Sequence, residues 1–88
     1  MIKIHELKVN KEFFEKILSG DKNYEVRLGD TEYQIGDTIK LFEKDPLTKE
    51  LTGRSIEKTI TVISNTKNIT YWTKEDIEKF GLKIIGFK

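Results

Sequence analysis

Apolar and polar residues alternate along several stretches of the chain, and this period of two predicts β-strands. The first strand runs to about Leu7, because Ile2 and Ile4 alternate with polar neighbours. Similar patterns predict further strands, which lie over residues 23–28, 38–43, 54–64 and 82–87. In the strand over 23–28 the apolar side chains fall on one face, which we expect to be buried, and the charged side chains fall on the other.

One stretch near the N-terminus has the spacing of a short amphipathic helix. Asn10 is a suitable N-cap, and an apolar stripe begins at Phe13 and Phe14 and repeats one turn later. Gly20 can end the helix in a left-handed conformation. We expect this helix to bury both phenylalanines in the core.

A second short helix is predicted close to the C-terminus. Thr73 with an acidic residue three positions later forms a capping box, and the helix it begins ends at about Phe80. Tyr71 and Trp72 come directly before it, and we expect this pair to cap the core, with one ring partly exposed. An exposed ring there is suited to stacking on a base.

The predicted elements assign the chain to one α+β domain over residues 1–88, because this length leaves no room for a second domain. The order is strand, helix, three strands, short helix and strand. Five strands with two short helices favour a small, strongly curved mixed sheet that closes into a barrel.

The composition restricts the cofactors and the location. The chain contains no cysteine and a single histidine, which excludes disulfides and argues against a metal site, and no motif calls for another cofactor. No apolar run approaches the roughly 20 residues that cross a bilayer, and the first residues do not resemble a signal peptide. We therefore expect a cytoplasmic protein without a membrane partner.

The charge is nearly balanced, with a net value of +1. Any binding to nucleic acid must then depend on a local basic patch and not on the overall field. Fourteen of the sixteen basic residues are lysine. The two arginines, Arg27 and Arg54, stand out because a guanidinium can hold phosphate or carboxylate with two parallel hydrogen bonds.

The segment Gly20-Asp21-Lys22-Asn23-Tyr24-Glu25-Val26-Arg27, placed after the first predicted helix, resembles the G-x-K-x-x-E-x-R signature of ASCH domains. The similarity covers nearly the whole chain, since it continues in His5-Glu6-Leu7-Lys8, Phe13-Phe14, Gly36-Asp37 and Thr52-Gly53-Arg54. It points to a bacterial and phage group of ASCH-like domains without an assigned function. The resemblance implies a PUA-like pseudo-barrel of five or six strands, with a cleft beside the Gly-x-Lys segment that holds RNA or a nucleotide-like molecule.

The candidate ligand-binding residues in this signature are Lys22, Glu25 and Arg27. Each has a structural alternative: Lys22 can complement the dipole at the helix end, and Glu25 with Arg27 can form a surface ion pair of about 0–1 kcal/mol. In the functional interpretation, a guanidinium holds a phosphate or a base edge, and a carboxylate accepts from an exocyclic amine or acts as a general base.

Three further candidates support this set. The family pattern includes His5 and Lys8, at the end of the first strand, although a lone histidine is more often a structural residue. Arg54 follows a glycine at the start of a predicted strand, where it is either a hairpin surface residue or a second phosphate contact. The partner is thus RNA or a nucleotide-like small molecule, of unspecified identity.

Two other functions remain open at this point. Some small members of the family resemble amidohydrolases that remove an acyl group from modified cytidines with a lysine, a threonine and a glutamate. Lys22 and Glu25 would then be catalytic, but Glu25 stands where such a threonine is expected. The third possibility is a protein-interaction adaptor that uses an exposed strand or an aromatic patch around Trp72. The oligomeric state is not fixed by the sequence.

Overall fold

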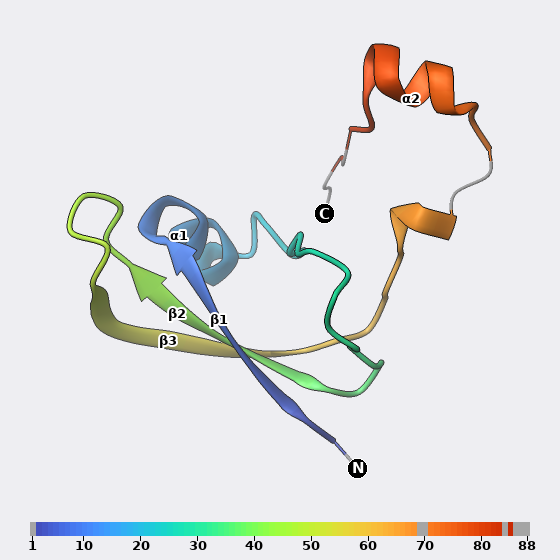
Figure 1. The fold of residues 1–88 in the computed structure, drawn as a ribbon. Helices are drawn as coiled ribbons and strands as arrows, with labels where there is room; N and C mark the ends of the chain where they lie inside the picture. Colours follow the sequence, from blue (N-terminus) through green and yellow to red (C-terminus); the bar gives the residue numbers. More distant parts are fainter. Residues whose placement is uncertain (1, 69–70, 84, 86–88) are drawn as a thin grey trace.

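The computed structural model describes residues 2–68, 71–83 and 85 of the chain (Figure 1). Its elements, in order, are β1 (Ile4–Asn10), α1 (Lys11–Ser19), β2 (Thr38–Lys44), β3 (Leu51–Thr59), the 3-10 helix η1 (Thr66–Asn68) and α2 (Lys74–Phe80). The three strands form one open sheet in the order β1-β2-β3.

The sequence-based prediction of a barrel with five or six strands is therefore wrong. Residues 23–28 are extended but belong to no strand, and Leu82 also lies outside any strand. Ile84 and Phe87, which were expected in the closing strand, lie outside the described residues. Alternation of apolar and polar residues reports only an extended backbone, whereas closing a barrel requires partners far along the chain.

The sheet combines a parallel and an antiparallel pair of strands. β1 runs parallel to β2, with α1 and residues 20–37 as the connection between them. β2 and β3 form an antiparallel hairpin. Asp45 begins its turn, and its Oδ1 accepts hydrogen bonds from the amides of Leu47 at 2.8 Å and Thr48 at 3.2 Å.

β3 begins and ends earlier than the alternation suggested. Just after it, Ile60 is buried and continues the pairing with the loop before β2. Its amide donates to the carbonyl of Asp37 at 2.8 Å, and its carbonyl accepts from the amide of Gly36 at 2.9 Å. These bonds tie the end of the loop before β2 to the chain just after β3.

The core lies between α1 and one face of the sheet. Buried residues from three elements form it, namely Val9, Phe14, Ile17 and Leu41, with Leu7, Ile39 and Ile56 packed around them. Phe14 is 1% exposed, but Phe13 is 42% exposed, so the expectation that both are buried is wrong. Successive helical residues point about 100° apart, and only one of two neighbours can point directly at the sheet.

The predicted signals at the end of α1 and at the beginning of α2 are confirmed, but the predicted cap at the beginning of α1 is not formed. Gly20 is left-handed, with φ of 86°, and its amide donates to the carbonyl of Ile17. The Thr73 hydroxyl accepts from the amide of Asp76 at 3.1 Å, which caps α2. Asn10 precedes α1 with extended dihedrals, but its side chain makes no capping bond.

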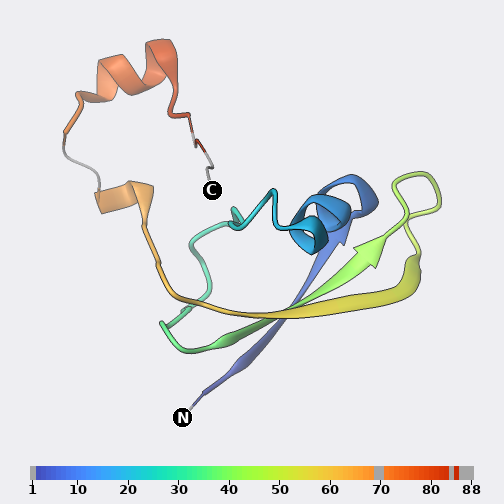
Figure 2. The same ribbon diagram turned by 180° about the vertical axis from the view of Figure 1, so that it is seen from behind.

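α2 lies apart from the sheet in both views of the ribbon (Figures 1 and 2). None of its described residues is buried, and Tyr71 and Trp72 before it are both exposed. The expectation that this aromatic pair caps the core is thus wrong. Neither α2 nor any other helix of the described chain is long and apolar enough to cross a membrane.

Candidate ligand-binding site

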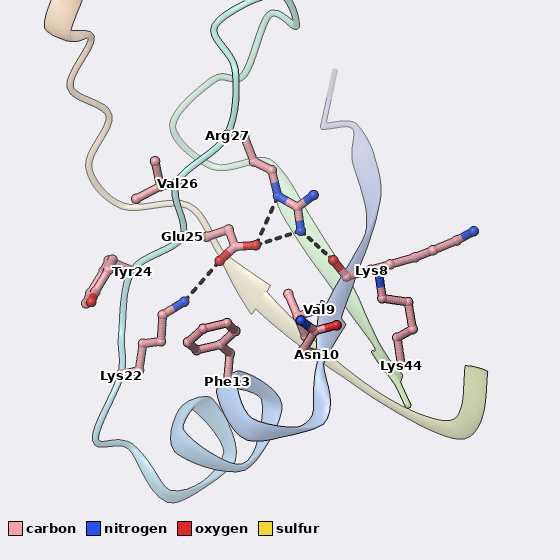
Figure 3. A pocket seen from close by; sticks show the side chains of 10 residues that line it. All are labelled: Lys8, Val9, Asn10, Phe13, Lys22, Tyr24, Glu25, Val26, Arg27 and Lys44. Atoms are coloured by element: carbon pink, nitrogen blue, oxygen red, sulfur yellow. Dashed lines mark hydrogen bonds and ion pairs between the residues drawn. The ribbon is translucent and has the colours of Figure 1, made fainter. Parts of the chain in front are cut away.

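A cavity of about 380 Å³ lies between the second half of β1, the first turn of α1 and the extended segment after α1 (Figure 3). Ten residues line it: Lys8, Val9, Asn10, Phe13, Lys22, Tyr24, Glu25, Val26, Arg27 and Lys44. Four of these, Lys8, Lys22, Glu25 and Arg27, are candidates from the sequence.

The segment over residues 22–27 reaches the cavity because α1 ends in a tight turn. After the left-handed Gly20, the amide of Lys22 donates to the carbonyl of Lys16 at 2.9 Å, and the chain reverses. The apolar side chains of this segment were predicted to be buried, and the structure shows the opposite. Tyr24 and Val26 are exposed, whereas the side chains of Lys22 and Glu25 are only 13% and 15% exposed.

The Glu25 carboxylate is the centre of the site. Its Oε1 accepts from Lys22 Nζ at 3.0 Å, and its Oε2 accepts from Arg27 Nε at 3.0 Å and from Arg27 Nη2 at 2.6 Å (Figure 3). Arg27 Nη2 also donates to the carbonyl of Lys8 at 2.6 Å. Side chains, not a backbone ladder, therefore hold the segment beside β1.

Two aromatic rings surround the Lys22 ammonium. Its Nζ lies 5.4 Å from the centroid of the Phe13 ring and 4.8 Å from that of Tyr24. Both distances are in the range of cation–π contacts. The cavity consequently has two flat apolar surfaces next to its charged groups.

The lining of the cavity is positively charged. The lining contains four cationic residues, Lys8, Lys22, Arg27 and Lys44, and one carboxylate, Glu25, which leaves an excess of three positive charges. The chain as a whole carries only +1. Within the described residues, Lys8 and Lys44 make no ion pair. The site therefore attracts anions although the whole protein does not.

Asn10 adds an unused hydrogen-bond acceptor to the lining. Its Oδ1 is buried and, among the described residues, has no hydrogen-bond partner. An unpaired buried polar atom costs about 1–3 kcal/mol. A ligand that brings an N–H or O–H donor to this oxygen would recover that free energy.

His5 lies at the other end of β1 and does not line the cavity. Its Nε2 is 2.8 Å from Asp37 Oδ2, and its ring centroid is 4.6 Å from that of Tyr33. Asp37 is buried and also accepts from the amides of Lys3 and Gln34. The hydrogen bond from His5, followed by that from Lys3, lowers the pKa of Asp37. Asp37, which belongs to the Gly36-Asp37 part of the family pattern, thus ties β1 to the loop before β2.

Arg54 is also outside the cavity, in a separate cluster above Phe14. Its guanidinium donates to Glu43 at 3.0 and 2.6 Å, contacts Glu15, and lies 5.0 Å from the Phe14 ring centroid. Hydrogen bonds from Arg54 and then Thr52 lower the pKa of the buried Glu43 to about 2. The hydrogen bonds of Arg54 to Glu43 and then to Glu15 raise the pKa of Arg54. The geometry matches a structural ion pair.

The described residues contain no group of three His, Cys, Asp or Glu side chains arranged to hold a metal ion. The acidic residues of the three clusters are instead engaged by arginine, lysine or histidine, as in the pairs Glu25–Arg27, Glu43–Arg54 and Asp37–His5.

Several residues of the cavity were not identified as site residues from the sequence. Phe13 and Tyr24 were assigned to the core, and Asn10 was assigned to a helix cap. Lys44 is one of fourteen lysines, and it carries no local signal that separates it from the rest. It enters the cavity because the parallel register aligns it with Asn10, a pairing that only the folded sheet reveals.

Comparison with known proteins gives two matches. Residues 4–77 match the family model described as "Domain of unknown function (DUF3850)". An Escherichia phage P2 protein, named "Uncharacterized 12.9 kDa protein in GpA 3'region", is 38% identical over 65 residues. The aligned region is 74% of this chain and 58% of that phage protein, so the chain spans a little over half of its relative's length.

Proposed function

We propose that this chain, which belongs to the DUF3850 family of domains of unknown function, binds RNA or a nucleotide-like molecule in the cavity around Glu25. The main support is the convergence of four cations, two aromatic rings and an unpaired acceptor on one cavity of about 380 Å³. Nucleotides combine an anionic group, a flat apolar base and polar edges, and each of these has a counterpart there.

The phosphate is assigned to the cations that are not already paired. Lys8 and Lys44 face no carboxylate among the described residues, so a phosphate there displaces only water. Arg27 is shared between Glu25 and the carbonyl of Lys8, and it remains about one third exposed. One guanidinium edge is therefore accessible from the solvent for a further oxygen.

The base is assigned to the aromatic side of the cavity. The rings of Phe13 and Tyr24 are partly exposed there, and stacking on such a ring contributes about 1–3 kcal/mol per base. Glu25 and Asn10 supply acceptors for exocyclic amines or hydroxyls. The volume lies near the lower end of about 300–1,000 Å³ for small-molecule sites, which suits a single nucleotide unit and not a duplex.

The resemblance to the ASCH signature is part of this proposal. The three signature positions, Lys22, Glu25 and Arg27, are the ones joined by hydrogen bonds at the cavity. A signature whose members meet at one site is more readily explained by a shared ligand than by unrelated surface contacts. His5 and Arg54, which have partners elsewhere, would act indirectly through the fold.

The test is a titration of the isotope-labelled chain with a short single-stranded RNA and with a nucleoside monophosphate, followed by backbone amide shifts. We expect shifts at Lys8, Asn10 and residues 22–27, and weaker binding at higher salt. Lys22→Ala should weaken binding by about tenfold, because a hydrogen bond to a charged group contributes about 1.5–3 kcal/mol. Lys83→Ala, with the same loss of charge outside the cavity, is the control.

Shifts that scatter over the surface, or equal losses in Lys22→Ala and Lys83→Ala, would count against a specific site. No shifts with either ligand at millimolar concentration would remove the proposal. The measurement therefore separates binding at this cavity from general attraction between lysines and phosphates.

A second candidate function, hydrolysis of an acylated nucleoside, has one observation in its favour. Lys22 Nζ and Glu25 Oε1 are 3.0 Å apart with both side chains mostly buried, which is the pair that a proton transfer would use. Turnover of acetylcytidine by the wild type, lost in Lys22→Ala, would support catalysis. If no turnover occurs at high protein concentration, hydrolysis of that substrate is excluded and binding remains the proposed function.

A further inference from the structure

The face of the sheet opposite α1 carries an aromatic residue among lysines. Along β2, Leu41 and Glu43 are buried toward α1, so by alternation Lys40, Phe42 and Lys44 project from the opposite face. In Figures 1 and 2, α1 and residues 20–37 lie on the core side of the strands. No helix of the described chain covers the other side.

The strand register places a third lysine beside the ring. Lys8 on β1 is paired with Phe42 on β2, and Phe42 is paired with Ser55 on β3. Lys40 Nζ lies 5.3 Å from the Phe42 ring centroid. Phe42 is therefore surrounded by Lys8 on the neighbouring strand and by a lysine two residues away on each side of its own strand.

The charge on this face is not uniform. The register places Lys40 between Glu6 on β1 and Glu57 on β3. The row of paired residues that crosses the three strands at Lys40 therefore contains two carboxylates. The row through Phe42 contains Lys8 and the neutral Ser55, and the next row joins Asn10 and Lys44. The basic part of the face is thus the part that begins at Phe42 and ends at Lys44.

This basic part is continuous with the cavity. Lys8, Asn10 and Lys44 belong both to these rows and to the cavity lining. In Figure 3 the side chain of Lys8 extends away from the Glu25 carboxylate and that of Lys44 runs toward Lys8, whereas those of Lys22 and Arg27 point toward the carboxylate. The cations accordingly form a path around β1 from one side of the sheet to the other.

We infer that a single-stranded polynucleotide follows this path, with one unit in the cavity and a neighbouring base stacked on Phe42. The inference rests on the proposed function, which it extends from one nucleotide to a strand. An aromatic ring on a sheet, flanked by lysines, matches the alternation of base and phosphate along a single strand. A duplex keeps its bases stacked inside and offers none to the ring.

The length of the ligand provides the test. Binding of a uridine oligonucleotide of about eight units, within the 4–16 that one small domain can cover, is compared with that of a uridine dinucleotide by fluorescence anisotropy. The variant is Phe42→Ala, with Phe42→Leu as the version that keeps an apolar side chain and removes only the ring. Phe80→Ala on α2 is the matched control, because Lys79 Nζ lies 5.2 Å from that ring in a similar contact.

We expect the oligonucleotide to bind more tightly than the dinucleotide. Both Phe42 variants should weaken oligonucleotide binding by about 5- to 100-fold, the range of one lost base stack, and leave the dinucleotide within about twofold of wild type. Phe80→Ala should change neither ligand. Circular dichroism of Phe42→Leu confirms that the sheet is intact.

If the dinucleotide binds and the oligonucleotide gains nothing, or if the Phe42 variants bind the oligonucleotide like wild type, the extended path is overturned while the cavity site stands. If Phe42 substitutions weaken both ligands equally, the ring belongs to the cavity site and the path is again overturned. If neither ligand binds, the proposed function itself fails.

Discussion

The two adjacent phenylalanines of α1 have different roles, one in the core of the protein and the other in the proposed site. Phe14 is 1% exposed and lies in the centre of the core, whereas Phe13 is 42% exposed and lines the cavity. Substituting each with alanine removes the same atoms from neighbouring positions of one helix. We predict that Phe14→Ala damages stability and that Phe13→Ala damages binding.

The magnitudes follow from the burial of each ring. Replacing a fully buried phenylalanine with alanine costs about 3–5 kcal/mol, because transfer free energy is lost and a cavity remains. An 88-residue domain has a free energy of unfolding of about 4–13 kcal/mol at the usual 0.05–0.15 kcal/mol per residue. Phe14→Ala should therefore remove about a quarter or more of the total stability. For Phe13, whose ring keeps nearly half of its exposure, we expect about 1–2 kcal/mol.

Urea unfolding followed by circular dichroism measures these differences. With a slope of about 1–3 kcal/mol per molar urea, Phe14→Ala should lower the midpoint by at least about 1 M, and Phe13→Ala should lower it by distinctly less. Binding of the nucleoside monophosphate, measured on the folded fraction, should weaken only for Phe13→Ala. Equal midpoints for the two variants, or a greater loss of stability in Phe13→Ala, would refute the assignment of the two rings.

Three other predictions concern single local features. The pKa of Glu43 in the folded protein, about 2, is below its ordinary value of 4.5, so the stabilising contribution of Glu43 is present above pH 4.5 and is lost as the pH falls toward 2. Glu43→Gln should lower the melting temperature at neutral pH and make it depend less on pH in the acid range, as measured by calorimetry. A melting temperature that falls with acid as steeply as in the wild type would contradict this. Gly20→Ala should cost about 1 kcal/mol in urea unfolding, because φ is 86° and an added Cβ meets no atom within 4 Å, which leaves backbone strain as the cause. Thr73→Ala should speed amide hydrogen exchange at Asp76 and in the following turn, because the cap of α2 is lost. The urea midpoint should stay constant, since α2 buries none of its described residues. A lower midpoint would show that α2 stabilises the core.

The sequence predicted those features that depend on neighbouring residues. Gly20 ends α1 and Thr73 caps α2, because each signal is a local hydrogen bond or dihedral preference. The ion pair between Glu25 and Arg27 belongs to the same class, since the two residues are two positions apart in the sequence.

The alternation over residues 23–28 misled the prediction in two respects. Extended chain has a period of two whether or not it pairs with a strand, so the pattern could not distinguish a loop from a strand. It also favoured burial of Tyr24 and Val26, whereas the protein buries Glu25, whose charge is matched by Lys22 and Arg27. Burial of a charged residue depends on partners that the alternation does not include.

The contact between Arg27 and the backbone of Lys8 has a consequence beyond ligand binding. In the described chain β1 pairs with β2 on one side only, and the Lys8 carbonyl that accepts from Arg27 faces the other side. A strand with unpaired carbonyl and amide groups is a template for another chain, and it can initiate aggregation. The guanidinium covers one of these groups, so the residue that holds the binding segment in place also protects the protein from self-association through β1.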